Sequence, residues 1–277
     1  MIEVFFQYDF LRYSLYTGLM IGFLAPVVGV FIVVRRLSMM ADALSHITLT
    51  GIAFSLLLGR YYPFFAGLNP VYMGMVFSIS GALLIEKLRH MYQYYKELAI
   101  PIILSGAIGV GVLFISLADG FNNDLFNYLF GSVVAISETD FHVVIVLTFL
   151  VSLVLLLFYK ELFFLSFDEE QAVISGLPKR SLHFIFMILV ALVIGISMQI
   201  VGILLVSALM TLPVASAMRW ARGFKQMFLY AVLFGEVSVI TGLISAFHLD
   251  LAPGGTIVMT NIALLIGSIA LTRKRSL

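Results

Sequence analysis

Cysteine is absent from the 277 residues of this chain, and charged side chains are scarce. Without thiols the chain forms no disulfide and no thiolate metal site, so a soft-metal site would have to use His, carboxylate or Met side chains. Only 11% of the residues are charged, 62% are hydrophobic, and the mean hydropathy is +1.11. A soluble domain of this size cannot bury so much apolar surface. The composition therefore predicts an all-α, polytopic membrane protein.

Several sequence motifs of catalysis are also missing. The chain has no Gly-x-x-x-x-Gly-Lys-Ser/Thr, so it does not hydrolyse a nucleotide with a P-loop of its own. It has neither His-Glu-x-x-His nor Gly-x-Ser-x-Gly, which leaves a membrane protease or esterase with little support. The formal net charge of +1 argues against a nucleic-acid partner. These absences favour a function other than catalysis.

Nine apolar segments are long enough to be considered as membrane spans. They lie near residues 11–34, 39–58, 71–86, 99–118, 140–159, 181–199, 201–218, 226–247 and 256–272. Eight full spans and one re-entrant piece are an alternative, with the second segment in doubt because its uninterrupted apolar run is short. The sequence thus predicts about eight or nine transmembrane helices.

Basic residues alternate between the connections of these segments. They follow the first, third, fifth, seventh and ninth segments, for example at Arg35, Arg36, Lys87, Arg89 and Lys179. The other connections hold almost none. By the positive-inside rule, the N-terminus is expected outside the cell and the C-terminus in the cytoplasm.

An Asp and a His lie four residues apart in the second segment. Ser38 is a candidate N-cap for a helix running to Leu58, and on that helix Asp42 and His46 share one face. An ionisable side chain at membrane depth costs about 2.5–3.5 kcal/mol on insertion scales, so it usually faces a cavity or a partner. Alternatively, Asp42 merely complements the helix N-terminus and His46 bonds a neighbouring carbonyl.

Imidazole nitrogen and carboxylate oxygen together suit Zn²⁺, and also Mn²⁺ or Fe²⁺. The Asp42–His46 pair supplies only two ligands. Further ligands would have to come from a second, two-fold-related copy of the chain, from water or from other spans. The pair is therefore a candidate metal or proton site.

Three further ionisable residues are weaker metal candidates. Glu236 lies inside the eighth segment, where a carboxyl group is costly unless it is protonated or hydrogen-bonded. His248 and Asp250 follow the outer end of the same segment and could gather a cation there, although solvated loop residues are the simpler interpretation.

Two connections are more than turns. The stretch 123–137 is apolar and aromatic but short, which suits a helix at the outer interface or a pore plug. The stretch 166–178 predicts a short helix, capped by Asp168 and ended by Gly176 and Pro178. Such a helix could dock on a cytoplasmic partner or could be an ordinary structured loop.

The run from Arg35 to His46, with its Leu-Ser-Met-Met-Ala-Asp-Ala-Leu-Ser-His, resembles the signature of the permease subunits of bacterial metal-ion (zinc, manganese and iron) ABC importers. Three further matches follow in order: Leu-Phe-Gly at 129–131, Gln-Ile-Val-Gly at 199–202 with Leu-Pro at 212–213, and Pro-Gly-Gly-Thr at 253–256. The resemblance covers nearly the whole chain.

This resemblance implies a single transmembrane permease domain over residues 1–277 in the bacterial cytoplasmic (plasma) membrane. It implies a homodimer, two cytoplasmic ATP-binding subunits that supply ATP hydrolysis, an extracellular metal-binding solute-binding protein, and no permanently bound cofactor. It assigns the transported Zn²⁺ or Mn²⁺ to Asp42 and His46, and it makes the stretch near 167–176 an ATPase-coupling helix. The coupling residues would be Phe167, Asp168, Glu169, Gln171, Ala172 and Gly176.

The stretches 8–12 and 33–38 look more like zinc permeases than manganese ones, so zinc is the expected cargo. A manganese or iron importer would have the same architecture. A proton-coupled secondary transporter, with Glu236 and His46 as a relay, would transport without any ATPase. An intramembrane metal-dependent hydrolase lacks an obvious general base beside the Asp42–His46 pair.

Overall fold

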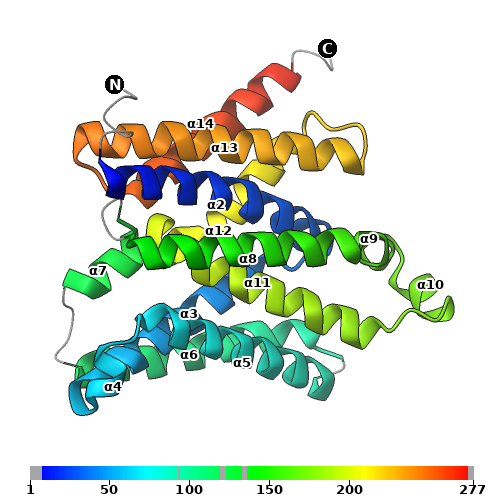
Figure 1. Ribbon diagram of the computed structural model, residues 1–277. Coiled ribbons are helices and arrows are strands. Elements are labelled where there is room, and N and C mark those ends of the chain that lie inside the picture. The colour runs from blue at the N-terminus through cyan, green and yellow to red at the C-terminus, as the bar shows by residue number, and fades with distance from the viewer. Residues whose placement is uncertain (1–7, 93, 119–122, 133–135, 274–277) are drawn as a thin grey trace.

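The computed structural model describes residues 8–92, 94–118, 123–132 and 136–273, and this part of the chain is helical without any strand (Figure 1). The long helices are α2 (Asp9–Val34), α3 (Ser38–Tyr61), α5 (Pro70–Met91), α6 (Ala99–Leu117), α8 (Glu138–Leu157), α11 (Lys179–Val201), α12 (Ile203–Ala217), α13 (Phe224–Leu249) and α14 (Pro253–Arg273). The short ones are α4 (Pro63–Ala66), α7 (Asn123–Phe130), α9 (Tyr159–Phe167), α10 (Glu169–Ile174) and a 3₁₀ turn at Lys96–Leu98.

Each of the nine predicted segments corresponds to one long helix. Eight helices of the described residues are long and apolar enough to cross a membrane, which confirms a polytopic, all-α protein. The doubt about the second segment was wrong, because α3 has 24 residues. The short segment is α12, with 15 residues, since Gly202 separates it from α11. Ser38 is the first residue of α3 and not its cap; the capping position belongs to Leu37 and provides no side-chain bond.

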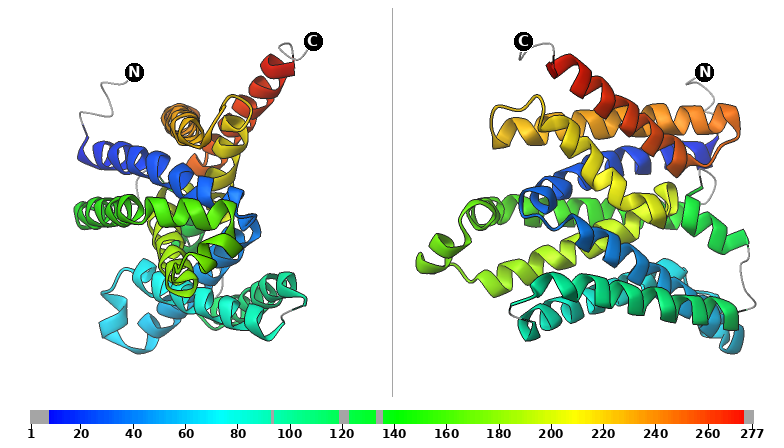
Figure 2. Two further views of the ribbon diagram at one scale, coloured as in Figure 1. Left: turned by 90° about the vertical axis from the view of Figure 1, so that its right-hand side faces the viewer. Right: turned by 180° about the vertical axis from the view of Figure 1, so that it is seen from behind.

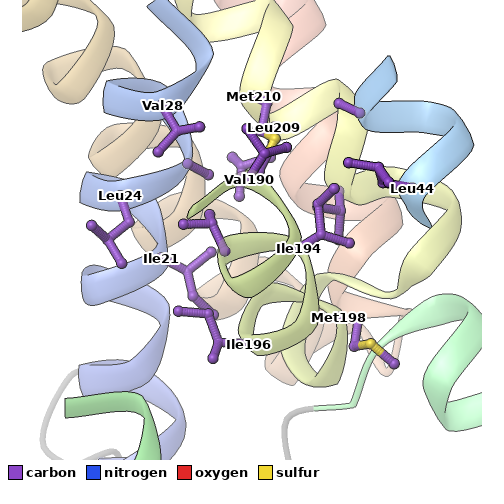
Figure 3. Packing of buried hydrophobic residues seen from close by; sticks show 14 of the residues in the cluster. Ile21, Leu24, Val28, Leu44, Val190, Ile194, Ile196, Met198, Leu209 and Met210 are labelled. Atoms are coloured by element: carbon purple, nitrogen blue, oxygen red, sulfur yellow. The ribbon is translucent and has the colours of Figure 1, made fainter. Parts of the chain in front are cut away.

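The core of the bundle is built around α11. Of the most apolar 18-residue stretch of each helix, 78% is buried in α11, compared with 17% in α6 and in α8. Figure 3 shows how Ile194 and Val190 of α11 pack between side chains of α2, such as Leu24, and of α12, such as Leu209. Because α6 and α8 keep most of their apolar surface exposed, they form the periphery of the chain.

The helices lie in layers, with α13 and α14 on one side, α5 and α6 on the other, and α11 between them (Figures 1 and 2). The short helices α7 and α10 lie at opposite ends of the bundle (Figure 1). We call the end that carries α9 and α10 the α10 end. The basic residues after α2 and α5 and at the start of α11 lie at this end, around one cavity.

Candidate metal site and its surroundings

The side chains of Asp42 and His46 lie one helical turn apart on α3, as the sequence predicts. Both are half-buried, whereas the neighbouring Ala41, Ala43 and Ser45 are fully buried. The helix thus turns its small residues into the core and leaves the two ionisable side chains on a partly open face. Partial exposure at membrane depth is what a site needs if an ion has to enter and leave it.

Ser207 of α12 is the partner that the structure adds to Asp42. Its Oγ donates a hydrogen bond to Asp42 Oδ1 over 3.3 Å. Thr211 lies one turn further along the same face of α12, and its hydroxyl donates to the carbonyl of Ser207 in its own helix. A hydroxyl that donates to a carboxylate restricts the orientation of that carboxylate. Ser207 therefore helps to position the Asp42 carboxylate.

Among the described residues, no group of three or more His, Asp or Glu side chains lies close enough to hold a metal ion. The Asp42–His46 pair is therefore not completed by a third such ligand from another described helix of the same chain. A tetrahedral or octahedral site would need neutral oxygen ligands, water or a second copy of the pair.

The three weaker metal candidates, Glu236, His248 and Asp250, do not belong to a cluster of possible metal ligands among the described residues. Glu236 is half-buried between α13 and α2, with Oε2 close to Gly22, and this oxygen has no hydrogen-bond partner among the described residues. His248 is exposed, and its Nδ1 lies 2.8 Å from the carbonyl oxygen of Ile244. Asp250 ends α13 in the left-handed conformation, at φ 54°. These surroundings give His248 and Asp250 roles in ending a helix.

Three sequence motifs from distant parts of the chain meet where α11 passes into α12. Gly202 has a φ of 80°, a backbone conformation that residues other than glycine rarely adopt, and it ends α11. A Cβ on Gly131 would lie 1.9 Å from the carbonyl oxygen of Ile200, and one on Gly254 would lie 1.8 Å from that of Val201. The backbones of α7, of the α11–α12 break and of α14 therefore touch. This junction fixes the start of α12, the helix that carries Ser207.

The predicted helix near 167–176 is present as α10, and the end of α9 precedes it. Asp168 caps α10 by accepting a hydrogen bond from the amide of Gln171, and Gly176 follows with φ at 86°. Ala172 is fully buried against Leu165 and Leu182, so it supports α10 from inside.

The exposed apolar surface of this segment comes from other residues. Phe167 is 60% exposed, Val173 47% and Ile174 84%. The sequence interpretation included Phe167 but missed Val173 and Ile174, which face away from the side of the helix that buries Ala172.

A second group of ionisable side chains, which the sequence analysis missed, lies at the α10 end. Arg35 Nη2 donates to His183 Nδ1 over 2.9 Å, and His183 Nε2 lies 3.0 Å from Glu86 Oε2. Because Nδ1 accepts a bond, the proton of a neutral imidazole must be on Nε2, facing Glu86. His183 is only 6% exposed. The Arg35–His183–Glu86 network therefore ties α5 and α11 to the residue that follows α2.

Ion pairs surround this network. Glu86 also lies 3.6 Å from Arg89 and 3.4 Å from His90, and Glu169 of α10 pairs with Lys179 of α11. Burial lowers the pKa of the Arg35 guanidinium below its ordinary value. The hydrogen bond from Lys179 holds the pKa of Glu169 below the ordinary value of a glutamate.

Known proteins resemble this chain over almost its whole length. The ABC 3 transport family (ABC-3) matches residues 7–272. The manganese transport system membrane protein MntC of Listeria innocua is 35% identical over 258 residues, covering 93% of this chain and 89% of its own. The high-affinity zinc uptake system membrane protein ZnuB of Haemophilus influenzae is 30% identical, covering 95% and 98%.

A solved structure shares the fold. PsaBC from Streptococcus pneumoniae, determined in complex with Fab, matches with a TM-score of 0.84 and 31% identity, covering 97% of this chain and 95% of that chain. The resemblance inferred from the sequence motifs is thus confirmed, as is a multi-pass protein of the bacterial cytoplasmic membrane. This chain belongs to the ABC 3 transport family.

Proposed function

We propose that this protein is the membrane-spanning permease subunit of an ATP-driven importer for a divalent metal ion. The observation that carries the proposal is the half-buried Asp42–His46 pair on a helix long enough to span a membrane, in a chain of the ABC 3 transport family. An ionisable pair that is neither buried nor saturated by partners binds an ion without trapping it. Residues 1–277 act as one transmembrane permease domain, with the α10 end in the cytoplasm.

The transport site forms between two copies of the chain. One Asp42–His46 pair supplies two ligands, and a two-fold axis beside α3 would bring a second pair to the same ion. Four protein ligands would suit Zn²⁺, and added hydroxyl or water oxygens would suit Mn²⁺. The absence of a third His, Asp or Glu ligand beside the pair, among the residues described, supports this arrangement. An extracellular solute-binding protein delivers the ion to the other end of the bundle.

ATP is hydrolysed by two separate cytoplasmic subunits that dock on α10. The exposed Phe167, Val173 and Ile174 offer an apolar surface for this contact, and the capped helix holds them in place. Asp168, Glu169, Gln171 and Gly176 shape the same segment. Because α10 is tied to α11 by the Glu169–Lys179 pair, a movement of the docked subunit would reach the bundle through α11.

The cargo is a divalent metal ion, and the relatives divide between two choices. The sequence pattern favoured zinc, and a zinc uptake protein is 30% identical. A relative named for manganese is 35% identical, and the carboxylate and hydroxyl oxygens of Asp42 and Ser207 are ligands that Mn²⁺ accepts. Zinc therefore stays the proposed cargo, and manganese is the alternative that the second relative supports.

The direct experiment is uptake of radioactive manganese and zinc by cells that lack the gene and carry the wild type, His46→Ala or an empty vector. We expect the wild type to restore uptake of one metal, an excess of that metal but not of the other to compete, and His46→Ala to remain at background. Equal uptake by His46→Ala and the wild type would show that the site lies elsewhere. Transport by the purified chain alone, without an ATPase, would favour the proton-coupled alternative.

A further inference from the structure

A cavity of about 520 Å³ opens at the α10 end, and its lining is strongly basic. It lies between the end of α2, the end of α5, the start of α11 and the α9–α10 segment. Six Lys or Arg side chains line it against two Glu side chains: Arg35, Arg36, Arg89, Lys96, Lys179 and Arg180 against Glu86 and Glu169. Positive-inside residues ordinarily point into open solvent. Here residues from four separate segments converge on one hollow.

The two carboxylates in the cavity are already engaged. Glu86 lies within 4 Å of His183, Arg89 and His90, and Glu169 pairs with Lys179. Over the described residues, no carboxylate pairs with Arg36, Lys96 or Arg180. Three positive charges around the cavity therefore have no counter-charge from the described part of the chain.

Arg35 adds a fourth positive charge. Its Nη2 donates to the imidazole of His183, which is uncharged in the tautomer that this bond requires. Its Nη1 is buried and has no hydrogen-bond partner among the described residues. Because this nitrogen has almost no solvent-accessible surface, Arg35 acts on an anion in the cavity through its charge and not through a direct hydrogen bond from Nη1.

The edge of the cavity near the α5–α6 connection has the character of a membrane interface. Tyr92, Tyr94 and Tyr95 precede the cavity residue Lys96 and are 41%, 95% and 69% exposed. Exposed tyrosines beside basic residues at the end of a spanning helix mark the level of the lipid head groups. Basic pockets between transmembrane helices on the cytoplasmic side bind phosphate-bearing lipid head groups.

We propose that this cavity is a binding site for a phosphate-bearing anion, occupied by the head group of an anionic phospholipid of the inner leaflet. The phosphate lies among the unpaired Arg36, Lys96 and Arg180, with the charge of Arg35 beside it. Because Glu169 and Val173 of α10 also line the cavity, a bound head group supports the segment on which the ATPase is proposed to dock. The site does not depend on which metal is transported.

Native mass spectrometry of the full-length chain, isolated in detergent and incubated with equal amounts of phosphatidylglycerol and phosphatidylcholine, tests this proposal. We expect the wild type to retain phosphatidylglycerol at least about tenfold better. The triple variant Arg36→Gln/Lys96→Gln/Arg180→Gln removes the unpaired cations but leaves the Arg35–His183–Glu86 network intact, and it should lose this preference. If it does not fold, the single variants Lys96→Gln and Arg180→Gln, both at exposed positions, should each weaken the preference severalfold.

The matched control is Lys160→Gln/Arg222→Gln/Lys225→Gln, which removes the same charge from sequence positions outside the cavity lining. It should keep the lipid preference. Equal retention of the two lipids by the wild type, or an equal loss in both triple variants, would overturn the proposal.

A second arm separates the sources of phosphate. Inorganic pyrophosphate at millimolar concentration should not displace phosphatidylglycerol if the lipid is the ligand. If pyrophosphate displaces phosphatidylglycerol from the wild type but has no effect on the Arg36→Gln/Lys96→Gln/Arg180→Gln variant, the cavity binds an anion, but its ligand is a soluble phosphate. The triple cavity variant could instead bind lipid normally but no longer copurify with its ATPase. In that case the cavity binds carboxylates of the ATPase subunit, and the proposal is wrong. Metal uptake is not part of this readout, so it fails or succeeds independently of the proposed transport function.

Discussion

Two groups of ionisable side chains lie within the long helices of this protein, and they differ in how completely they are paired. At Asp42 and His46, the described residues of other helices supply one hydrogen bond, from the Ser207 hydroxyl to Asp42 at 3.3 Å, and both side chains are half-buried. At the α10 end, His183 is 94% buried and is bridged on both ring nitrogens by Arg35 and Glu86. We propose that the difference separates a site left open for an ion from a network that holds helices together.

The reason for the difference is the cost of desolvation. A buried charge is stabilised when partners replace its water, and those partners also reduce its capacity to bind a passing ion. The Arg35–His183–Glu86 network has this structural character. For the Asp42–His46 pair, which we propose as the metal site, the described residues supply few partners, so its ligand atoms stay available to an ion. We therefore expect substitutions in the Asp42–His46 pair to change transport more than stability, and substitutions in the Arg35–His183–Glu86 network to change stability more than transport.

Substitution of the open pair should have the largest effect on transport and a small effect on folding. We expect Asp42→Asn or His46→Ala to reduce metal uptake at least about 100-fold, because each removes half of the ligands that a chain provides. The measurement is the initial rate of uptake, normalised to the amount of folded protein in the membrane. His142→Ala, which removes an exposed His whose Nδ1 faces only the carbonyl of Glu138, is the matched control. Uptake retained by His46→Ala would remove His46 from the site.

Substitution of the closed network should show the reverse pattern. His183→Leu leaves Arg35 and Glu86 facing an apolar side chain, so we expect a loss of stability of about 2–4 kcal/mol. Unfolding in mild detergent measures this loss, while uptake per folded molecule should stay within about twofold of the wild type. If instead stability is unchanged and uptake disappears, His183 belongs to the transport path and the comparison between the two groups fails.

Ser207→Ala should have an intermediate effect on the open pair. The variant removes one hydrogen bond to the Asp42 carboxylate, so we expect metal affinity to fall about three- to tenfold, which corresponds to about 1 kcal/mol. Equilibrium binding of the imported metal to the purified complex is the measurement. Thr211→Val removes a hydroxyl one turn away that bonds only within α12, and it should leave the affinity unchanged. Equal effects of the two variants would mean that Ser207 acts through α12 alone.

The smallest effect is expected at the exposed Glu169–Lys179 pair. Because the folded-state pKa of Glu169 is lowered, the pair stabilises the protein above the unfolded-state pKa, and this stabilisation is lost as the pH falls through the folded-state value. An exposed pair contributes less than about 1 kcal/mol. Glu169→Gln should therefore lower the unfolding midpoint slightly at pH 7, and the difference should shrink as the pH falls below the ordinary pKa of a glutamate. A difference that grows toward low pH would contradict the assignment.

The helices and the open pair could be predicted from sequence because both depend on residues close together in the chain. Nine apolar runs identify nine helices, and the spacing of Asp42 and His46 places them on one face without knowledge of the fold. The length of α12 was harder to predict, because its boundary depends on Gly202 adopting a positive φ beside α7 and α14.

The contacts between helices could not be predicted in the same way. Ser207 meets Asp42 across 165 positions in the chain, and Arg35 meets His183 across 148. The sequence around a single Ser in an apolar helix, or around a single His near the start of a helix, does not indicate which distant residue it contacts. Val173 and Ile174 were missed for a different reason: they look like core residues, and only the packing of Ala172 shows that they face outward.

The measurement that tests the central claim most directly is the amount of metal bound by the purified complex at equilibrium, counted per copy of this chain. A site shared by two Asp42–His46 pairs predicts one transported ion for every two copies, and none in His46→Ala. One ion for each copy, or binding that survives in both His46→Ala and Asp42→Asn, would contradict it, because the ion would then be held by residues other than the open pair.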